Sequence, residues 1–251
     1  MIYAIKTGEQ TVDADHSPMT IYTAQPDDGK KHPAVIVVME LFGVNDNIRD
    51  ITNKIAELGY IAVAPDFYHR TKRPGDIPYG DQGRAYGFEQ LNQLTRQHVW
   101  TDTDAAIASL KSMPGFNHKI GIVGFSVGGH MAFLAAAKFP FSAVACFYGG
   151  WLTNTEIPIS RPDPTVTLTK DLVANGSRLI YFAGGKDPHI TQDQLEAMET
   201  VFETEKLAYQ LVVYPGSSHG FFCDRRPDDY NAADHDDAWQ RLQEFLSSAL
   251  K

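Results

Sequence analysis

The chain has 251 residues, and its 22 Lys and Arg against 31 Asp and Glu give a net charge of −9 with His neutral. This surplus of acid opposes binding to the phosphates of nucleic acids and to anionic lipid, so we expect neither nucleic acid nor a membrane as a partner. With 43% hydrophobic and 21% charged residues, the composition is that of an ordinary globular protein and excludes a disordered chain.

The N-terminus and the two cysteines bear on the location of the protein. Met1 to Gln10 shows no basic region followed by an apolar run, and no stretch reaches about 18 consecutive apolar residues. We therefore expect a cytoplasmic protein. Cys146 and Cys223 stand in different contexts and in no metal-ligand spacing, so we interpret both as free thiols and predict no metal site.

The first part of the chain alternates short β-rich runs with a helical pattern. A helix that starts at Asn45 or Asp46 and stops at Gly59 is indicated by apolar residues at helical spacing. The expected strands around it are Met1–Lys6, Met19–Thr23, Ala34–Met39 and Tyr60–Ala64.

The rest of the chain continues this alternation after a segment from His69 to Tyr86, which we expect to be a loop that crosses the open end of the sheet. Only the proline-bearing stretch Trp151–Thr169 is irregular beyond it. The expected helices are Phe88–Met113, Gly128–Lys138, Thr191–Glu205 and Tyr230–Leu250, and the expected strands are Ile120–Phe125, Ala143–Tyr148, Arg178–Ala183 and Tyr209–Tyr214. This order predicts one α/β domain over residues 1–251, a mainly parallel sheet of about eight strands with helices on both faces.

A glycine-rich turn joins the predicted strand that ends at Phe125 to a helix of small residues. Its sequence, Gly124-Phe125-Ser126-Val127-Gly128, has the G-x-S-x-G pattern in the strand, turn and helix context that the pattern requires. The glycines relieve clashes, so the serine projects at the carboxyl end of the sheet, on a helix N-terminus that favours negative charge. We predict Ser126 as a nucleophile; the alternative is a turn whose serine is only structural.

A serine nucleophile needs a base and an orienting acid, which follow this motif in the order Asp, His. Asp187 and His219 each come just after the carboxyl end of a predicted strand, and such ends share one edge of a parallel sheet. We therefore expect both to converge on Ser126. Asp187, which precedes Pro188, can instead be a turn former with His189 as the functional neighbour, and His219 can be a loop histidine without a role.

Four runs of this sequence resemble the dienelactone hydrolase family of the α/β-hydrolase fold. The resemblance covers nearly the whole chain and implies a compact fold without a large cap domain, hydrolysis of an ester or lactone, and no cofactor. The family's nucleophile is typically a cysteine, whereas Ser126 stands at the matching position. The four runs are Met39 to Asn45, Pro65 to Arg70, Gly124 to Gly129 and Ser218 to Phe221.

The resemblance also implies roles for residues near the nucleophile. Glu40 matches the family's glutamate beside the nucleophile, and Arg70 matches an arginine that binds the substrate carboxylate through two parallel hydrogen bonds. A buried structural acid and a solvated loop arginine are the alternatives for these two residues. Cys223 stands where a second family arginine would fall, and Arg225 or Arg226 can take its place.

The fold supplies two backbone N–H groups to a developing oxyanion, and in this chain they belong to Leu41 and Val127. Phe42 and Trp151 lie just past strand ends and can line an apolar acyl pocket. The expected substrate contacts are therefore Glu40, Phe42, Arg70 and Trp151.

The expected activity is therefore cleavage of a small carboxylic ester or lactone through an acyl-enzyme intermediate on a Ser-His-Asp triad. A thioesterase or a small acyl-peptidase uses the same triad. Because the fold alone does not determine the substrate, both remain alternatives. A non-catalytic protein that keeps the fold to bind a ligand is the alternative from another class. The sequence leaves the oligomeric state open.

Overall fold

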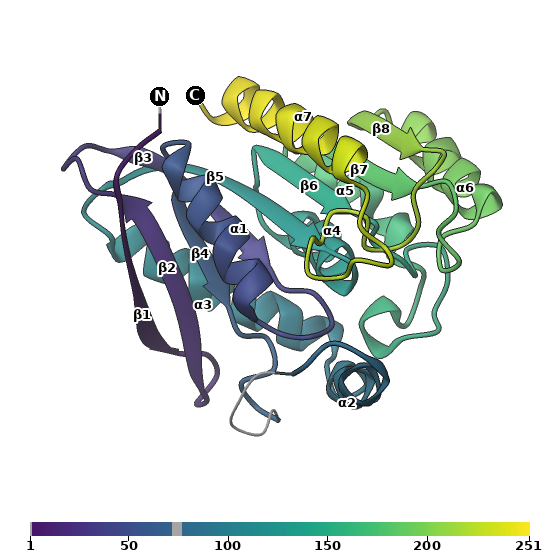
Figure 1. The fold of residues 1–251 in the computed structure, drawn as a ribbon, viewed down its shortest axis with the longest axis horizontal. Helices are drawn as coiled ribbons and strands as arrows, with labels where there is room; N and C mark the ends of the chain where they lie inside the picture. The colour runs from purple at the N-terminus through teal and green to yellow at the C-terminus, as the bar shows by residue number, and fades with distance from the viewer. Residues whose placement is uncertain (1, 72–76) are drawn as a thin grey trace.

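A computed structural model of the chain describes residues 2–71 and 77–251, and within them eight strands form one sheet in the order β1-β2-β4-β3-β5-β6-β7-β8 (Figure 1). The first two strands pair antiparallel with their neighbours, whereas all pairs from β4 to β8 are parallel. The strands are β1 (Ile5–Asp13), β2 (Pro18–Pro26), β3 (His32–Val38), β4 (Ile61–Pro65), β5 (Phe116–Phe125), β6 (Ala143–Phe147), β7 (Arg178–Gly184) and β8 (Ala208–Tyr214).

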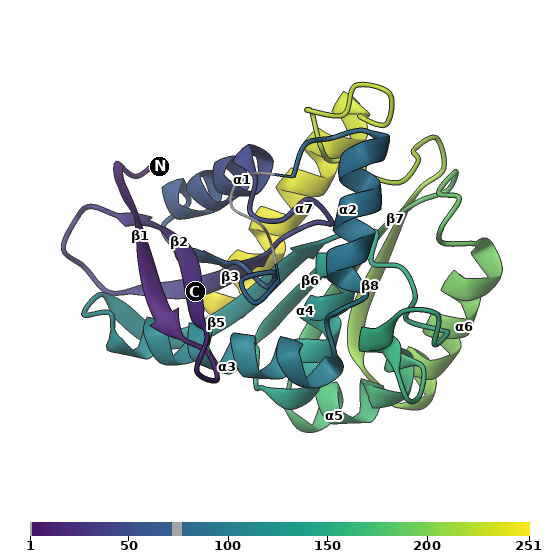
Figure 2. The ribbon, with the colours of Figure 1, turned by 90° about the horizontal axis from the view of Figure 1, so that it is seen from below.

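Helices cover both faces of this sheet, as Figures 1 and 2 show. The face covered by α1 and α7 lies opposite the face covered by α3, α4, α5 and α6, while α2 lies across the edge between them. The helices are α1 (Asp46–Glu57), α2 (Asp81–Leu91), α3 (Arg96–Ser112), α4 (Val127–Lys138), α5 (Thr169–Ala174), α6 (Gln192–Thr204) and α7 (Ala232–Leu250). Among the described helices, none is long and apolar enough to cross a membrane.

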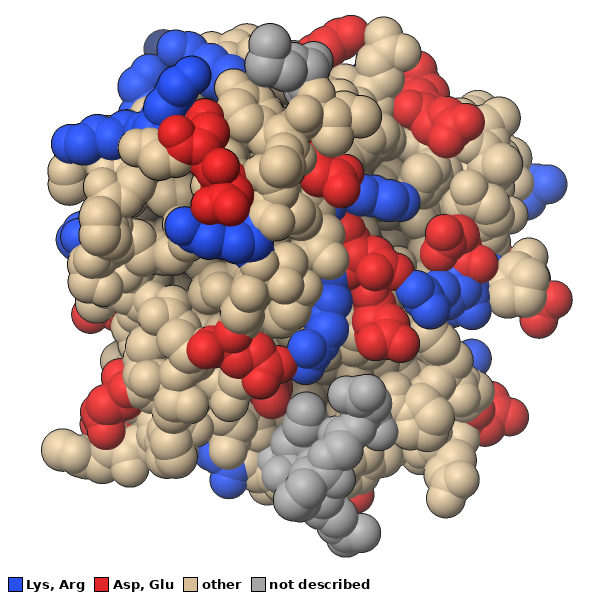
Figure 3. Space-filling view, turned by 60° about the vertical axis from the view of Figure 1, so that its left-hand side comes forward, with Lys and Arg blue, Asp and Glu red and all other residues tan. Residues whose placement is uncertain are grey.

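The central strands β3, β4 and β6 are buried along their whole length, since helices pack on both sides of them. Their near-continuous apolar sequences follow from this double burial, and the α/β fold predicted from them is confirmed. No large cap domain covers the sheet in the described part of the chain. Figure 3 shows acidic and basic side chains interspersed over much of one face.

The element bounds differ most from the sequence-based expectation between residues 69 and 113 and in the first strand. The single helix expected over Phe88–Met113 is two helices, α2 and α3, because Thr95 accepts a hydrogen bond from the His98 N–H and starts α3. The loop expected from His69 to Tyr86 contains the beginning of α2, and its residues 72–76 lie outside the described residues. The first strand covers Ile5–Asp13 and not Met1–Lys6, whose Met1 also lies outside the described residues.

Candidate active site

The turn between β5 and α4 holds Ser126 in a conformation that side chains rarely adopt, with φ of +55°. Two glycines make this turn possible. A Cβ on Gly124 would lie 1.9 Å from the carbonyl oxygen of Gly128, and a Cβ on Gly128 would lie 2.2 Å from that of Met39. The spacing of the glycines around Ser126 therefore follows from backbone contacts at the turn.

The structure brings Ser126, His219 and Asp187 together at the carboxyl edge of the parallel strands. The Oγ of Ser126 lies 2.8 Å from Nε2 of His219, and Nδ1 of His219 lies 2.8 Å from Oδ2 of Asp187. The second oxygen of Asp187 accepts the backbone N–H of His189 at 2.8 Å. Asp187 thus forms the turn that its sequence context suggested and still presents one oxygen to His219. All three side chains converge as the strand ends predicted.

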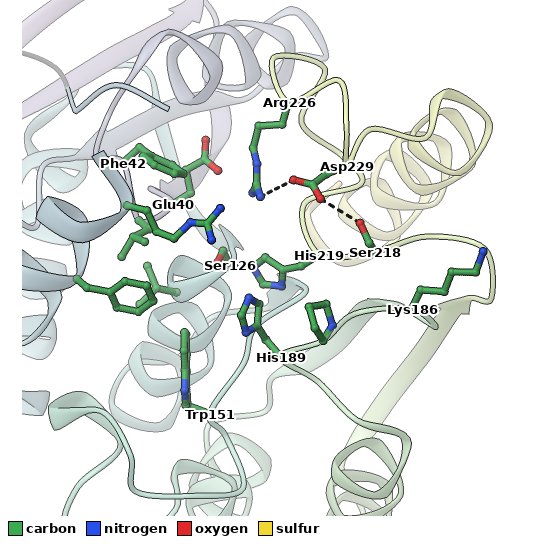
Figure 4. Close-up of a pocket in the computed structure, with 15 residues that line it drawn as sticks. Glu40, Phe42, Ser126, Trp151, Lys186, His189, Ser218, His219, Arg226 and Asp229 are labelled. Carbon is green, nitrogen blue, oxygen red and sulfur yellow. Dashed lines mark hydrogen bonds and ion pairs between the residues drawn. The ribbon is translucent and has the colours of Figure 1, made fainter. Parts of the chain in front are cut away.

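A cavity of about 540 Å³ opens above Ser126 and His219 (Figure 4). Its walls come from segments far apart in the sequence, among them the loop after β3, helix α2 and the loops after β6, β7 and β8. The residues predicted for the oxyanion and the acyl pocket line it, namely Leu41, Val127, Phe42 and Trp151. Its size suits a small organic substrate.

Leu41 and Val127 line the cavity, and their backbone N–H groups are the candidate donors to a ligand there. Val127 is the first residue of α4, where an N–H has no partner within the helix. Among the described residues, the loop and turn hydrogen bonds of the backbone use neither of these two N–H groups. Two donors beside a serine hydroxyl are what an oxyanion requires.

Glu40 lines the cavity but makes no hydrogen bond to Ser126 within the described residues. Its Oε1 accepts the Tyr79 hydroxyl at 2.7 Å and the side-chain amides of Asn45 and Asn47 at 3.4 and 3.3 Å. Figure 4 shows its carboxylate turned away from Ser126. Burial, and next the charge of Glu40, raise the pKa of Tyr79, so this hydroxyl stays protonated and donates.

Arg70 does not reach the cavity, which corrects its expected role as a ligand of the substrate. Its guanidinium forms two hydrogen bonds to Asp102, at 2.7 and 2.8 Å, and a third to the carbonyl of Ala14 at 3.2 Å. Asp102 is fully buried, and a buried carboxylate needs a counter-charge. Arg70 is therefore committed to a structural ion pair.

Other cations line the cavity instead, and they are Arg84, Lys186 and Arg226. Arg226, one of the two residues considered as a substitute for the second arginine, is paired with Asp229 at 2.5 Å (Figure 4). Its neighbour Arg225 pairs with Asp50 at the surface. Sequence reasoning missed Arg84 because it stands on α2, in a segment expected to be a loop. Only a helix at 81–91 would have placed it on one face with Phe88, four residues on.

Aromatic rings form another wall of the cavity. Trp151 lies edge to face with Phe88, with ring centroids 6.3 Å apart, and packs beside His189 at 6.4 Å. His189 in turn stands perpendicular to His219 at 5.1 Å. Burial, followed by the nearby His219, lowers the pKa of His189, which favours the neutral ring. Sequence reasoning considered His189 only as a competitor of Asp187 and did not predict this wall.

Comparison with known proteins identifies the family that this chain matches. The chain matches the dienelactone hydrolase family over residues 19–250. It is 32% identical to a Synechocystis protein named "Putative carboxymethylenebutenolidase" over 100% of both chains, and 33% identical to a protein of that name from Escherichia coli over 97% of this chain and 87% of the other. A crystal structure named "Putative Dienelactone Hydrolase" from Klebsiella pneumoniae has a TM-score of 0.87 and 31% identity, with 97% of this chain and 99% of that chain covered.

Proposed function

Because the chain belongs to the dienelactone hydrolase family and is a carboxylic ester hydrolase, we propose that it cleaves an ester or lactone through an acyl-enzyme on Ser126. The observation that carries this proposal is the continuous chain of contacts from Ser126 through His219 to Asp187, which opens into a cavity. A serine needs this arrangement more than a cysteine does, since a hydroxyl cannot be held as an anion at neutral pH.

The geometry supports the following sequence of steps. Ser126 Oγ attacks the carbonyl carbon while Nε2 of His219 takes its proton, and Asp187 stabilises the imidazolium that forms. The oxyanion of the tetrahedral intermediate accepts the N–H groups of Leu41 and Val127. His219 then returns the proton to the leaving alkoxide, and a water molecule, activated by the same histidine, releases the acid from Ser126.

The cations of the cavity point to a substrate with a carboxylate. Arg84 on α2 and Arg226 in the loop after β8 both line the cavity that contains Ser126. Guanidinium groups bind a carboxylate with paired hydrogen bonds, so these two residues take the role that the resemblance implied for Arg70. Unlike Asp102, the partner of Arg70, Asp229 is partly exposed and itself lines the cavity, so a substrate carboxylate can replace it at Arg226. The aromatic wall of Phe88, Trp151 and His189 suits a flat, apolar body next to the ester group.

The proposal is tested by hydrolysis of a short-chain aryl ester and of a dienelactone with the wild type, Ser126→Ala and Ser142→Ala. Ser142 is exposed and serves as the matched control. We expect the wild type and Ser142→Ala to cleave at least one substrate, and Ser126→Ala to lose at least about 10³-fold in kcat on both.

Two outcomes would contradict the proposal. If Ser126→Ala turned over substrate at the rate of the control, the acyl-enzyme on Ser126 would be refuted. If the folded wild type cleaved neither ester, the proposed hydrolysis itself would be refuted. The thioester and the acyl-peptide of the same acyl group belong in the same assay. A kcat/KM for either that exceeds that for the oxygen ester would identify the chain as a thioesterase or an acyl-peptidase.

A further inference from the structure

The peptide group between Glu40 and Leu41, which presents one of the two oxyanion donors, is held in place by its own loop. Its carbonyl, that of Glu40, accepts the N–H of Gly43 at 3.0 Å. The C=O and N–H of a trans peptide point in opposite directions, so this bond directs the Leu41 N–H away from the turn. Gly43 has φ of +77°, a conformation that glycine adopts at no steric cost.

The next peptide group is held from outside the loop. The carbonyl of Leu41 accepts the hydroxyl of Tyr68 at 3.3 Å, and Tyr68 is fully buried. Helix α2 rests on the same carbonyl at Gly87. A Cβ at that position would lie 2.6 Å from the Leu41 oxygen and 2.7 Å from its Cγ, closer than side chains approach in proteins. Only a glycine lets α2 reach this depth.

We propose that Gly87 is a positioning residue for the reaction at Ser126. By letting α2 rest on Leu41, it holds the backbone whose N–H binds the oxyanion. Glycine is a poor helix former, and here it stands inside an eleven-residue helix at the point of contact with Leu41. Hydrogen-bond donors stabilise a transition state only when their position is fixed before the charge develops. This inference rests on the proposed esterase function.

The test is Gly87→Ala, assayed with 4-nitrophenyl acetate, a neutral and short ester that makes no demand on Arg84 or on the aromatic wall. Loss of a whole oxyanion donor costs about 10²–10³-fold in kcat, so its displacement should cost about 10- to 100-fold. We expect KM to stay within about twofold. The affinity for a trifluoromethyl ketone, which forms a tetrahedral adduct with the serine, should fall by the same factor as kcat/KM.

Two further variants separate this role from the folding of α2. Ala85→Gly, at an exposed position of the same helix, changes the helix propensity by the same amount in the opposite direction without touching Leu41. It should keep the wild-type kcat. Tyr68→Phe removes only the hydroxyl that donates to the Leu41 carbonyl and should lower kcat less than Gly87→Ala does, again without a change in KM.

The proposal is overturned by a wild-type kcat in Gly87→Ala, or by an equal fall of kcat in Ala85→Gly. Should Gly87→Ala not fold, Tyr68→Phe decides alone, because an unchanged kcat and ketone affinity in that variant would show that the Leu41 carbonyl needs no support. Failure of the proposed esterase function would give a different set of rates. In that case Ser126→Ala would match the wild type, and no variant of α2 would matter.

Discussion

Three residues with side chains adopt positive φ angles around the cavity, namely Ser126, Tyr148 and Trp151, at +55°, +41° and +61°. Such conformations cost about 1–3 kcal/mol each and persist where the surrounding structure imposes them. Here each one directs a side chain at the site. Ser126 faces His219, the Tyr148 ring packs edge to face against His219 at 5.1 Å, and Trp151 enters the cavity wall. The strained backbone conformations therefore lie at residues whose side chains form the site.

Neighbouring arginines give a matched pair for testing carboxylate recognition. Arg226 lines the cavity, whereas Arg225 pairs with Asp50 at the surface. Arg226→Met should raise KM for an ester that carries a carboxylate by about tenfold, because a hydrogen bond to a charged group contributes about 1.5–3 kcal/mol. KM for the uncharged methyl ester should not change, and Arg225→Met should change neither. An equal rise for both esters in Arg226→Met would speak against carboxylate binding.

His130, inside α4, provides a pH-dependent contribution to stability. Its Nδ1 donates to the Gly150 carbonyl and its Nε2 accepts the Thr165 hydroxyl, both at 2.8 Å, and burial lowers its pKa to about 4. Between pH 4 and 6.5 the unfolded chain binds the proton that the folded protein excludes. Stability from this residue is therefore present above pH 6.5 and is lost as the pH falls.

The loss expected from His130 between pH 7 and pH 5 is about 2 kcal/mol of the free energy of unfolding. Urea unfolding of the wild type and of His130→Gln at both pH values measures it. The variant should be less stable at pH 7 but should lose about 2 kcal/mol less than the wild type on acidification. Parallel losses in the two proteins would show that the histidine is not held neutral.

The turn from β5 to α4 is the element on which the site depends most. The role of its glycines can be tested by comparison with a glycine that has free space around it. Gly128→Ala places a methyl group 2.2 Å from the Met39 carbonyl and should destabilise the fold by about 3 kcal/mol or more. Gly216 has nothing within 4 Å of an added Cβ, so Gly216→Ala should change stability by less than about 1 kcal/mol. Chemical denaturation of both variants decides, and equal stabilities would refute this account of the motif.

The type of an element was predicted well where its own residues show an apolar pattern typical of a buried strand or helix. The apolar runs of β3 and β6 and the strand, turn and helix around Ser126 have local patterns that fix their type, so the fold class was confirmed. The first part of helix α2 was expected to be a loop, because the buried positions of this helix include two glycines and its start has no side-chain cap. As a result, Arg84 was missed, whereas Arg70 was assigned from the family resemblance alone. A resemblance locates a run of sequence, but packing decides which arginine enters the cavity.

At the scale of the whole molecule, the net charge and the cavity have opposite signs. The chain carries −9, yet three cations and two carboxylates, Glu40 and Asp229, line the cavity. An approaching anion is repelled by charges spread over the molecule and attracted by Arg84 and Arg226 at contact distance. Because screening acts on separations beyond the Debye length, about 30 Å at 0.01 M and 8 Å at 0.15 M, salt weakens the repulsion more than the contacts.

The ratio of kcat/KM for a carboxylate-bearing ester to that for its methyl ester should therefore rise as ionic strength increases from about 0.01 to 0.15 M. The measurement uses a salt whose anion binds arginine weakly, so that competition for the cavity does not hide the effect. Arg226→Met should lower the ratio at every ionic strength but leave its upward slope, since the slope comes from the −9 of the whole chain. A ratio that falls with salt would mean that the cavity cations already act at long range and outweigh the net charge.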